Sequence, residues 1–307
     1  MTKITQRLSE KKKQKIKELL CIWSILIIPL ISLCVFWVYG TIQSIPIAFE
    51  HHLDDGTLKY DFNNFKTIFD SFNEPDNLLA QALGNTLTYW AVGFFFMMPV
   101  CFLMAFFLYK KILWYKFFRL VFFFPSIISS VIIAAFFKYI FGPGGQIPYI
   151  WETVFGKEGV LFLANSEYAF PTMIFYNIYT GLTGFLLYWL SAYARLPEEI
   201  MEAGRIDGLT DMGEFWYIAV PLTLPFYATM ALLSVTGILD AGGAALLLTG
   251  GAYGTYDVGF YLYKYTVSGS LNDQGLSGAV GLIKGALVLP IAAIVNHFVN
   301  KIETVEY

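Results

Sequence analysis

Hydrogen-bonding side chains interrupt two long apolar runs of this sequence. In residues 168–193, small and polar residues recur at helical spacings of three and four: Asn177, Thr180, Gly181 and Gly184. Residues 215–239 end on a similar group: Ser234, Thr236 and Gly237. On a helix the first group shares one face, where an amide and a hydroxyl can exchange hydrogen bonds with the hydroxyl groups of a solute. The same run holds Tyr176 and Tyr179, either of which can stack on a ring of such a solute.

These small and polar residues support two interpretations. Polar groups inside a membrane span are costly unless they face protein or a water-filled cavity, which favours a polar path for a solute. We assign five residues to this path: Asn177, Thr180, Gly181, Ser234 and Gly237. The alternative is packing, since small and hydroxyl residues are also common between membrane helices.

Other residues that could carry chemistry are isolated. Lys284 lies inside the apolar run 276–299, where it can extend outward or face the path, and the sequence leaves both open. His51 and His52 have no further ligand-type residue at metal spacing, so we expect a solvated loop and no metal site. The three cysteines lie in apolar runs and indicate no disulfide framework.

A polar segment, residues 196–215, separates two of the apolar runs. Pro197 suits a first helical position, and the acids that follow it favour a helix N-terminus. Gly208 then interrupts the helix, which predicts two short helices meeting at a bend. The first helix combines a glutamate with small residues that let another surface approach: Glu202, Ala203 and Gly204. The segment is therefore a candidate docking site, and the alternative is a solvated amphipathic loop.

The composition identifies the elements that position these residues. The chain has 307 residues, of which 57% are hydrophobic and only 14% charged, so it is not an ordinary soluble domain. Helices are required to cross lipid, because an open sheet would leave backbone groups unpaired. We predict an all-α integral membrane protein with six transmembrane helices at 19–39, 87–109, 117–141, 168–193, 215–239 and 276–299. Residues 1–18 form a basic tail and residues 303–307 a second tail.

Lysine and arginine residues predict the orientation. Most of them lie in the N-terminal tail, the 110–119 turn, the 195–205 segment and the C-terminal tail. By the positive-inside rule both termini and the 196–215 segment are cytoplasmic. Residues 240–254 then form an outer loop that is too short and too rich in glycine to cross the membrane.

The spacing within the polar segment resembles a known signature. Glu202-Ala203-Gly204, Gly208 four residues later, and Ile218-Ala219-Val220-Pro221 resemble the E-A-A, x3, G, x9, I-x-L-P motif of binding-protein-dependent ABC importer permeases. Gly204 and Val220 depart from that motif, and Gly204 should loosen the first helix by about 1 kcal/mol. Further likenesses cover most of residues 19–302 and point to the carbohydrate permeases of this family. Within that group the sequence resembles the maltose- and glycerol-phosphate-type first permease. The segments that carry these likenesses are Phe62 to Phe65, Asn85-Thr86, Phe117 to Pro125, and Leu248 to Gly251.

The resemblance implies a MetI-like bundle and a set of partners. In that family the coupling residues, here Glu202, Ala203, Gly204, Asp207 and Gly208, face cytoplasmic ATPases. The chain has no G-x-x-x-x-G-K-[ST] phosphate loop, so we expect no cofactor on this chain and ATP-Mg on the ATPase. The expected partners are a second permease, two ATP-binding subunits, an extracellular binding protein, a sugar and membrane lipid, with no nucleic acid. The expected location is the bacterial cell membrane.

Two other classes of protein compete with a permease subunit. An ion-coupled secondary transporter would share the spans and the buried polar groups, but it usually shows an internal repeat and buried carboxylates, neither of which is apparent here. A membrane enzyme would need a catalytic set, and both H-E-x-x-H and G-x-S-x-G are absent. We therefore predict a non-catalytic subunit.

Overall fold

The computed structural model describes residues 2–53, 57–74, 77–156, 160–267 and 269–301. Within these ranges it is helical apart from one hairpin, in which β1 (Glu50–His52) pairs antiparallel with β2 (Leu58–Tyr60) and Glu50 faces Tyr60. The predicted tail 303–307 lies outside the described residues. Except for its first residue, the predicted tail 1–18 is part of α1, which begins at Thr2.

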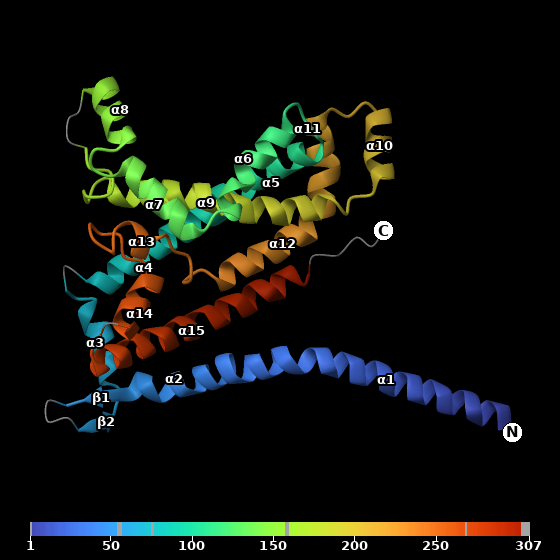
Figure 1. Cartoon of the computed structure of the whole chain (residues 1–307), viewed down its shortest axis with the longest axis horizontal. Helices are drawn as coiled ribbons and strands as arrows, with labels where there is room; N and C mark the ends of the chain where they lie inside the picture. Colours follow the sequence, from blue (N-terminus) through green and yellow to red (C-terminus); the bar gives the residue numbers. More distant parts are fainter. Residues whose placement is uncertain (1, 54–56, 75–76, 157–159, 268, 302–307) are drawn as a thin grey trace.

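The helices follow one another with three π-helical segments among them (Figure 1). The first half comprises α1 (Thr2–Ser32), η1 (Leu33–Tyr39), α2 (Gly40–Phe49), α3 (Asn63–Ser71), α4 (Leu78–Ala91), η2 (Val92–Met97), α5 (Met98–Tyr109), α6 (Tyr115–Ile127), α7 (Ser130–Phe141) and α8 (Gln146–Phe155). The second half comprises α9 (Ala169–Tyr193), α10 (Glu198–Ile206), α11 (Asp211–Glu214), η3 (Phe215–Ala219), α12 (Val220–Thr236), α13 (Ala245–Leu248), α14 (Val258–Val267) and α15 (Leu271–Val299).

Among the described residues, five helical stretches are long and apolar enough to cross a membrane: Lys17–Phe49, Leu78–Tyr109, Ser130–Phe155, Asp211–Thr236 and Leu271–Val299. Four of them contain or overlap the predicted first, second, fifth and sixth spans. The predicted fourth span forms α9, which has 25 residues but is not among the five. Polar residues of α9, including Asn177, Thr180 and Thr183, lower its mean hydropathy.

The third predicted span, 117–141, is wrong as a continuous helix. Ile128 and Ser129 are extended, with ψ of 144° and 133°, so α6 ends at Ile127 and α7 begins at Ser130. Pro125 lies inside α6 and cannot donate a helical hydrogen bond. Thr183 of α9 donates to the carbonyl oxygen of Phe122 over 2.5 Å, which holds α6 on α9. By length and composition the third candidate stretch is instead Ser130–Phe155, which itself consists of α7 and α8.

An aromatic core joins α5, α9 and η3. Its buried side chains are Phe102, Phe106, Trp189, Tyr193 and Phe215. The ring of Phe102 lies 4.7 Å from that of Trp189, and the ring of Phe106 lies 5.2 Å from that of Phe215. Because η3 leads directly from α11, this core fixes the base of the polar segment between α9 and α12.

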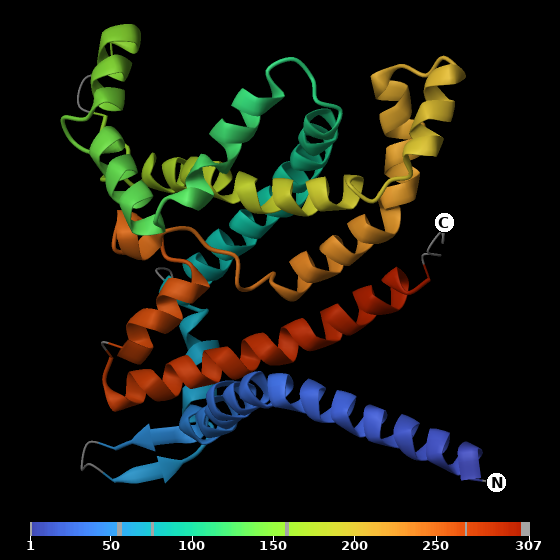
Figure 2. The same cartoon turned by 45° about the vertical axis from the view of Figure 1, so that its right-hand side comes forward.

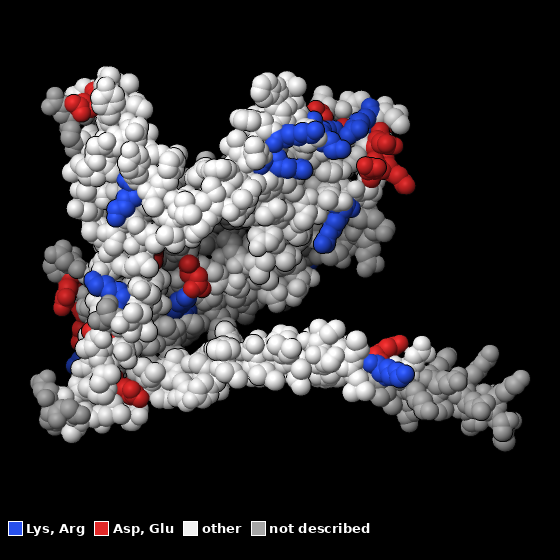
Figure 3. All heavy atoms as spheres, in the orientation of Figure 1, with Lys and Arg blue, Asp and Glu red and all other residues white. Residues whose placement is uncertain are grey.

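The two ends of the molecule differ. In Figures 1 and 2 the N-terminal end of α1, the end of α15, α10 and α11 lie at one end, whereas the hairpin, α3 and α8 lie at the other. In the view of Figure 3, Lys and Arg side chains gather near α5, α6 and α10, and most of the visible surface is uncharged. The predicted polar segment therefore lies at the same end as the beginning of α1 and the end of α15.

Candidate functional site

The polar segment folds into two short helices joined by a tight bend, as predicted. α10 begins directly after Pro197 and ends at Ile206. Gly208 has a φ of +85°, a left-handed conformation that favours glycine. The amide of Leu209 donates to the carbonyl of Gly204 over 2.9 Å and that of Gly208 to Arg205 over 3.1 Å, which is a Schellman termination. The bend is therefore fixed by the backbone of the helix end.

Gly204, where the sequence departs from the family motif, lies in a close packing contact. Gly204 is buried, and a Cβ atom added there would lie 2.5 Å from Cδ1 of Ile218 and 3.2 Å from Cδ1 of Leu209. The two ends of the motif, far apart along the segment, therefore touch each other. An alanine at position 204 would require the flexible end of the Ile218 side chain to shift.

One face of α10 is exposed. Glu199, Glu202, Ala203 and Ile206 follow at spacings of three and four, and all are exposed, Ile206 to 85%. Asp207, the helix-capping residue, is exposed as well, and its amide donates to the carbonyl of Ala203 over 2.9 Å. Of the residues predicted for coupling, the structure thus brings four to the surface and buries Gly204 beneath them.

A buried ion cluster supports this helix, and sequence reasoning missed it. Glu214 is only 1% exposed, and its carboxylate lies 2.6 Å from Nζ of Lys110 and 3.1 Å from Nε of Arg205. Lys110 also lies 2.8 Å from Asp211. The signal in the sequence was an acid, Glu214, directly before one apolar run and a lysine, Lys110, directly after another. Without the fold, nothing indicates that these two charges meet.

The predicted path residues on α9 divide into different roles. Asn177 and Thr180 are half-buried. The Asn177 amide donates to the carbonyl of Gly242 over 2.9 Å, and the Thr180 hydroxyl donates to Tyr176 of its own helix over 2.9 Å. A Cβ atom at Gly181 would lie 2.9 Å from Cε of Met97, so Gly181 makes room for η2. Packing is therefore the observed role of Gly181.

The remaining path residues lie near the end of α12. Ser234 accepts a hydrogen bond on its carbonyl oxygen from Trp90 Nε1 over 3.0 Å, and Gly237 caps the helix. Tyr176 is 4% exposed and packs edge-on to Phe137, so it cannot stack on a sugar ring. Tyr179 is half-buried.

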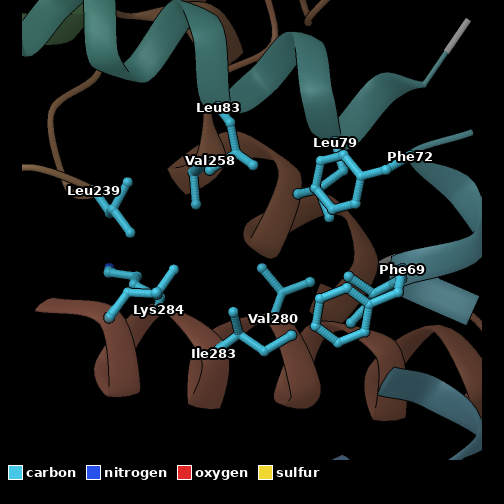
Figure 4. A pocket seen from close by; sticks show the side chains of 11 residues that line it. Phe69, Phe72, Leu79, Leu83, Leu239, Val258, Val280, Ile283 and Lys284 are labelled. Carbon is cyan, nitrogen blue, oxygen red and sulfur yellow. The ribbon is translucent and has the colours of Figure 1, made fainter. Parts of the chain in front are cut away.

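Lys284 forms an ion pair with Asp240, the first residue of the 240–254 loop. Figure 4 shows the lysine beside an otherwise apolar pocket formed with Leu239, Val258 and Ile283. The Lys284 side chain is 22% exposed and that of Asp240 is 62% exposed. The contact links α15 to the loop, which is a role that neither of the two sequence interpretations included.

The 240–254 loop is held by side chains from the surrounding helices. Asn177 contacts Gly242, and the amide of Asn85 donates to the carbonyls of Gly254 and Tyr256 over 2.8 and 2.7 Å. Asp257 is 3% exposed and accepts hydrogen bonds from the amides of Gly243 and Phe260. Burial raises the pKa of the Asp257 carboxyl, and those hydrogen bonds oppose the shift. The loop is thus a fixed structure.

The structure offers no cluster of three metal-ligating side chains among its described residues. His51, predicted to lie in a solvated loop, is instead partly enclosed: its Nδ1 lies 3.6 Å from the carboxylate of Asp61. The amide of Asn63 lies 3.4 Å from its Nε2. These contacts tie the hairpin to the start of α3.

With this geometry established, comparison with known proteins assigns the family. Residues 97–304 match the family described as "Binding-protein-dependent transport system inner membrane component", and the chain belongs to that family. It is therefore a multi-pass, non-catalytic permease subunit of a binding-protein-dependent ABC importer, which confirms the resemblance inferred from the coupling motif. The secondary-transporter alternative is set aside.

Relatives and solved structures agree with this assignment. The chain is 28% identical over 269 residues to the multiple sugar-binding transport system permease protein MsmF of Streptococcus mutans, covering 85% of this chain and 89% of the relative. It is 26% identical over 277 residues to the polygalacturonan/rhamnogalacturonan transport system permease protein YteP of Bacillus subtilis, covering 87% and 85%. A crystal structure of a bacterial ABC transporter for alginate import matches with a TM-score of 0.77 at 21% identity, covering 94% of this chain and 98% of that one. The fold is thus the MetI-like permease fold.

Proposed function

We propose that this chain is one of two permease subunits of an ATP-driven importer for a carbohydrate in the bacterial cell membrane. The named relatives are permeases of sugar and oligosaccharide systems. A second alginate transporter structure, with a TM-score of 0.76, is described in complex with a pentasaccharide-bound periplasmic protein. By analogy, an extracellular binding protein delivers an oligosaccharide to this chain and a second, distinct permease.

The exposed face of α10 is the observation that carries the proposal. Glu202, Ala203 and Ile206 form a small, accessible surface with acids at its edge, suited to a groove on a cytoplasmic ATPase. Two such ATPases bind ATP-Mg, and their closure displaces α10. Residues 196–215 thus form the coupling region, within a transmembrane domain 19–302 flanked by cytoplasmic tails at 1–18 and 303–307.

The distribution of charge supports a cytoplasmic position for α10. Lys and Arg side chains gather near α5, α6 and α10, at the end that also carries the beginning of α1 and the end of α15 (Figure 3). Short loops rich in Lys and Arg remain on the cytoplasmic side of a membrane. The hairpin and the 240–254 loop then face the outside.

The solute path runs beside α9 and the end of α12. Asn177 and Thr180 lie half-buried on α9 below the outer loop, while Ser234 and Gly237 lie near the end of α12. Gly181 contributes by letting η2 approach α9 rather than by binding. Sugar hydroxyls, which both donate and accept hydrogen bonds, suit the amide of Asn177 and the hydroxyl groups.

The test is reconstitution of the chain with the subunits that purify with it. We expect ATPase subunits to co-purify with the chain. We also expect the reconstituted assembly to take up one member of a panel of neutral and uronate-containing di- to pentasaccharides. Glu202→Trp should abolish ATPase association and uptake while leaving membrane insertion intact, because a bulky side chain cannot seat on the ATPase. The matched control is Glu152→Trp, at an exposed position on α8 at the opposite end. Full transport by Glu202→Trp would refute the docking role.

A further inference from the structure

Three helical elements meet at one buried carboxylate. Glu214, at the last position of α11, contacts Lys110 from the end of α5 at 2.6 Å and Arg205 from α10 at 3.1 Å. The Lys110 side chain is 8% exposed, that of Arg205 is 56% exposed, and that of Asp211, which also contacts Lys110, is 60% exposed. Two acids and two bases therefore form a cluster that is buried at Glu214 and open to solvent at Arg205.

Because Glu214 is buried, its carboxylate requires these contacts. A carboxylate removed from water is stable only when it is paired and hydrogen-bonded, and removing one partner leaves an uncompensated charge. Charge-assisted hydrogen bonds of this kind are shorter and stronger than neutral ones. The cluster therefore fixes the relative positions of α5, α10 and α11 more firmly than exposed ion pairs would.

The position of Glu214 in the chain gives this cluster a mechanical consequence. α10 joins the rest of the segment through the bend at Gly208, and its apolar support includes buried Met201 and the contact between Gly204 and Ile218. Glu214 stands directly before η3, which continues as α12 into the membrane stretch. Lys110 stands directly after α5, whose Phe102 and Phe106 enter the aromatic core.

We propose that Glu214 is a positioning residue that, with Lys110 and Arg205, clamps α10 to both α5 and α12. A displacement of α10 then moves the two membrane helices as one body instead of being absorbed by the bend at Gly208. The Arg205 contact transmits force from α10, and the Lys110 contact distributes it to α5. This inference rests on the proposed coupling function of α10.

The test compares solute uptake with ATP hydrolysis in the same proteoliposomes of the complete transporter. The probe is the oligosaccharide of the panel above that the unmodified assembly transports. Glu214→Gln should retain bound ATPase subunits and ATP hydrolysis, but the ratio of solute transported to ATP hydrolysed should fall to a small fraction of its normal value. Lys110→Met and Arg205→Gln should each lower the same ratio, whereas Lys110→Arg and Arg205→Lys, which keep the charge, should restore it. Lys111→Met, at the exposed neighbouring position, is the matched control for charge removal.

Each result decides between clamping and simple packing. A normal ratio in both Glu214→Gln and Arg205→Gln would overturn the clamp, even with the docking face of α10 confirmed. Equal losses in Arg205→Gln and Arg205→Lys would also overturn it, because charge would then be irrelevant. Should Glu214→Gln fail to assemble, the Arg205 pair still decides, since that side chain is largely in solvent. Failure of unmodified protein to bind any ATPase would instead reject the proposed function.

Discussion

Gly208 and Gly204 lie in the same motif but differ in their surroundings. Gly208 has a φ of +85° and open space around an added Cβ atom, so only its backbone conformation restricts the residue type. Gly204 has an ordinary helical conformation, but an added Cβ atom would meet Ile218. A single pattern in the sequence thus combines a conformational requirement at Gly208 with a close packing contact at Gly204.

Substitution at position 208 separates backbone strain from side-chain size. Gly208→Ala should destabilise the bend by about 1–2 kcal/mol, because a left-handed conformation is strained for residues with a Cβ atom. Gly208→Asn should be milder, since asparagine tolerates this region, and Gly208→Val should be the worst. Thermal unfolding and solute uptake of the three variants check the order. Equal effects of Asn and Val would show that conformation is not the restriction.

At the scale of elements, α9 and the 240–254 loop form one unit. Asn177 of α9 holds the loop at Gly242, and Asn85 of α4 holds its other end at Gly254 and Tyr256. Asp257 adds a further contact, because its carboxylate accepts a hydrogen bond from the amide of Gly243. A residue predicted to touch solute therefore has a second role in the structure of the loop.

Two asparagine variants distinguish contact with solute from support of the loop. We expect Asn177→Ala to weaken solute-stimulated ATP hydrolysis more than basal hydrolysis, because the amide that we propose to contact solute also holds the loop. Asn85→Ala removes two loop contacts without altering α9 and should cause a smaller loss. Kinetics of ATP hydrolysis at increasing oligosaccharide concentration measure both. If the two variants behave alike, Asn177 acts through the loop alone.

At the scale of the whole molecule, the consecutive helical elements α1, η1 and α2 stand apart from the other helices over most of their length. The apolar window of Lys17–Phe49 is 0% buried within the chain, whereas that of Leu78–Tyr109 is 39% buried. Only the α2 end packs closely, against α15. A surface of this kind is stable only in contact with lipid or another membrane subunit.

The two ends of the molecule should respond differently to a membrane-impermeant maleimide. In a chain whose native cysteines Cys21, Cys34 and Cys101 are replaced, Phe62→Cys should react on intact cells, because it follows the hairpin and its side chain is 72% exposed. Leu113→Cys, at an 83% exposed position in the turn between α5 and α6, should react only after permeabilisation. The reverse labelling pattern would invert the proposed orientation.

Local chemistry in the sequence predicted the parts that depend on a short stretch of chain. The apolar runs predicted most membrane helices, because 1.5 Å of rise per residue fixes the length needed to cross lipid. Gly208 predicted the bend, and the spacing from Glu202 to Pro221 predicted the family. The break after Ile127 was missed, because Pro125 alone does not distinguish a kinked helix from an interrupted one.

The sequence by itself therefore determined the class of protein, the order of its helices and the accessible motif. Only the tertiary structure decided which distant residues meet: Glu214 with Lys110, Lys284 with Asp240, Asn177 with Gly242 and Gly204 with Ile218. The physical reason is that apolar periodicity and helix termination act over one helical turn or one span. Ion pairs and close packing depend instead on how separate helices are placed in space.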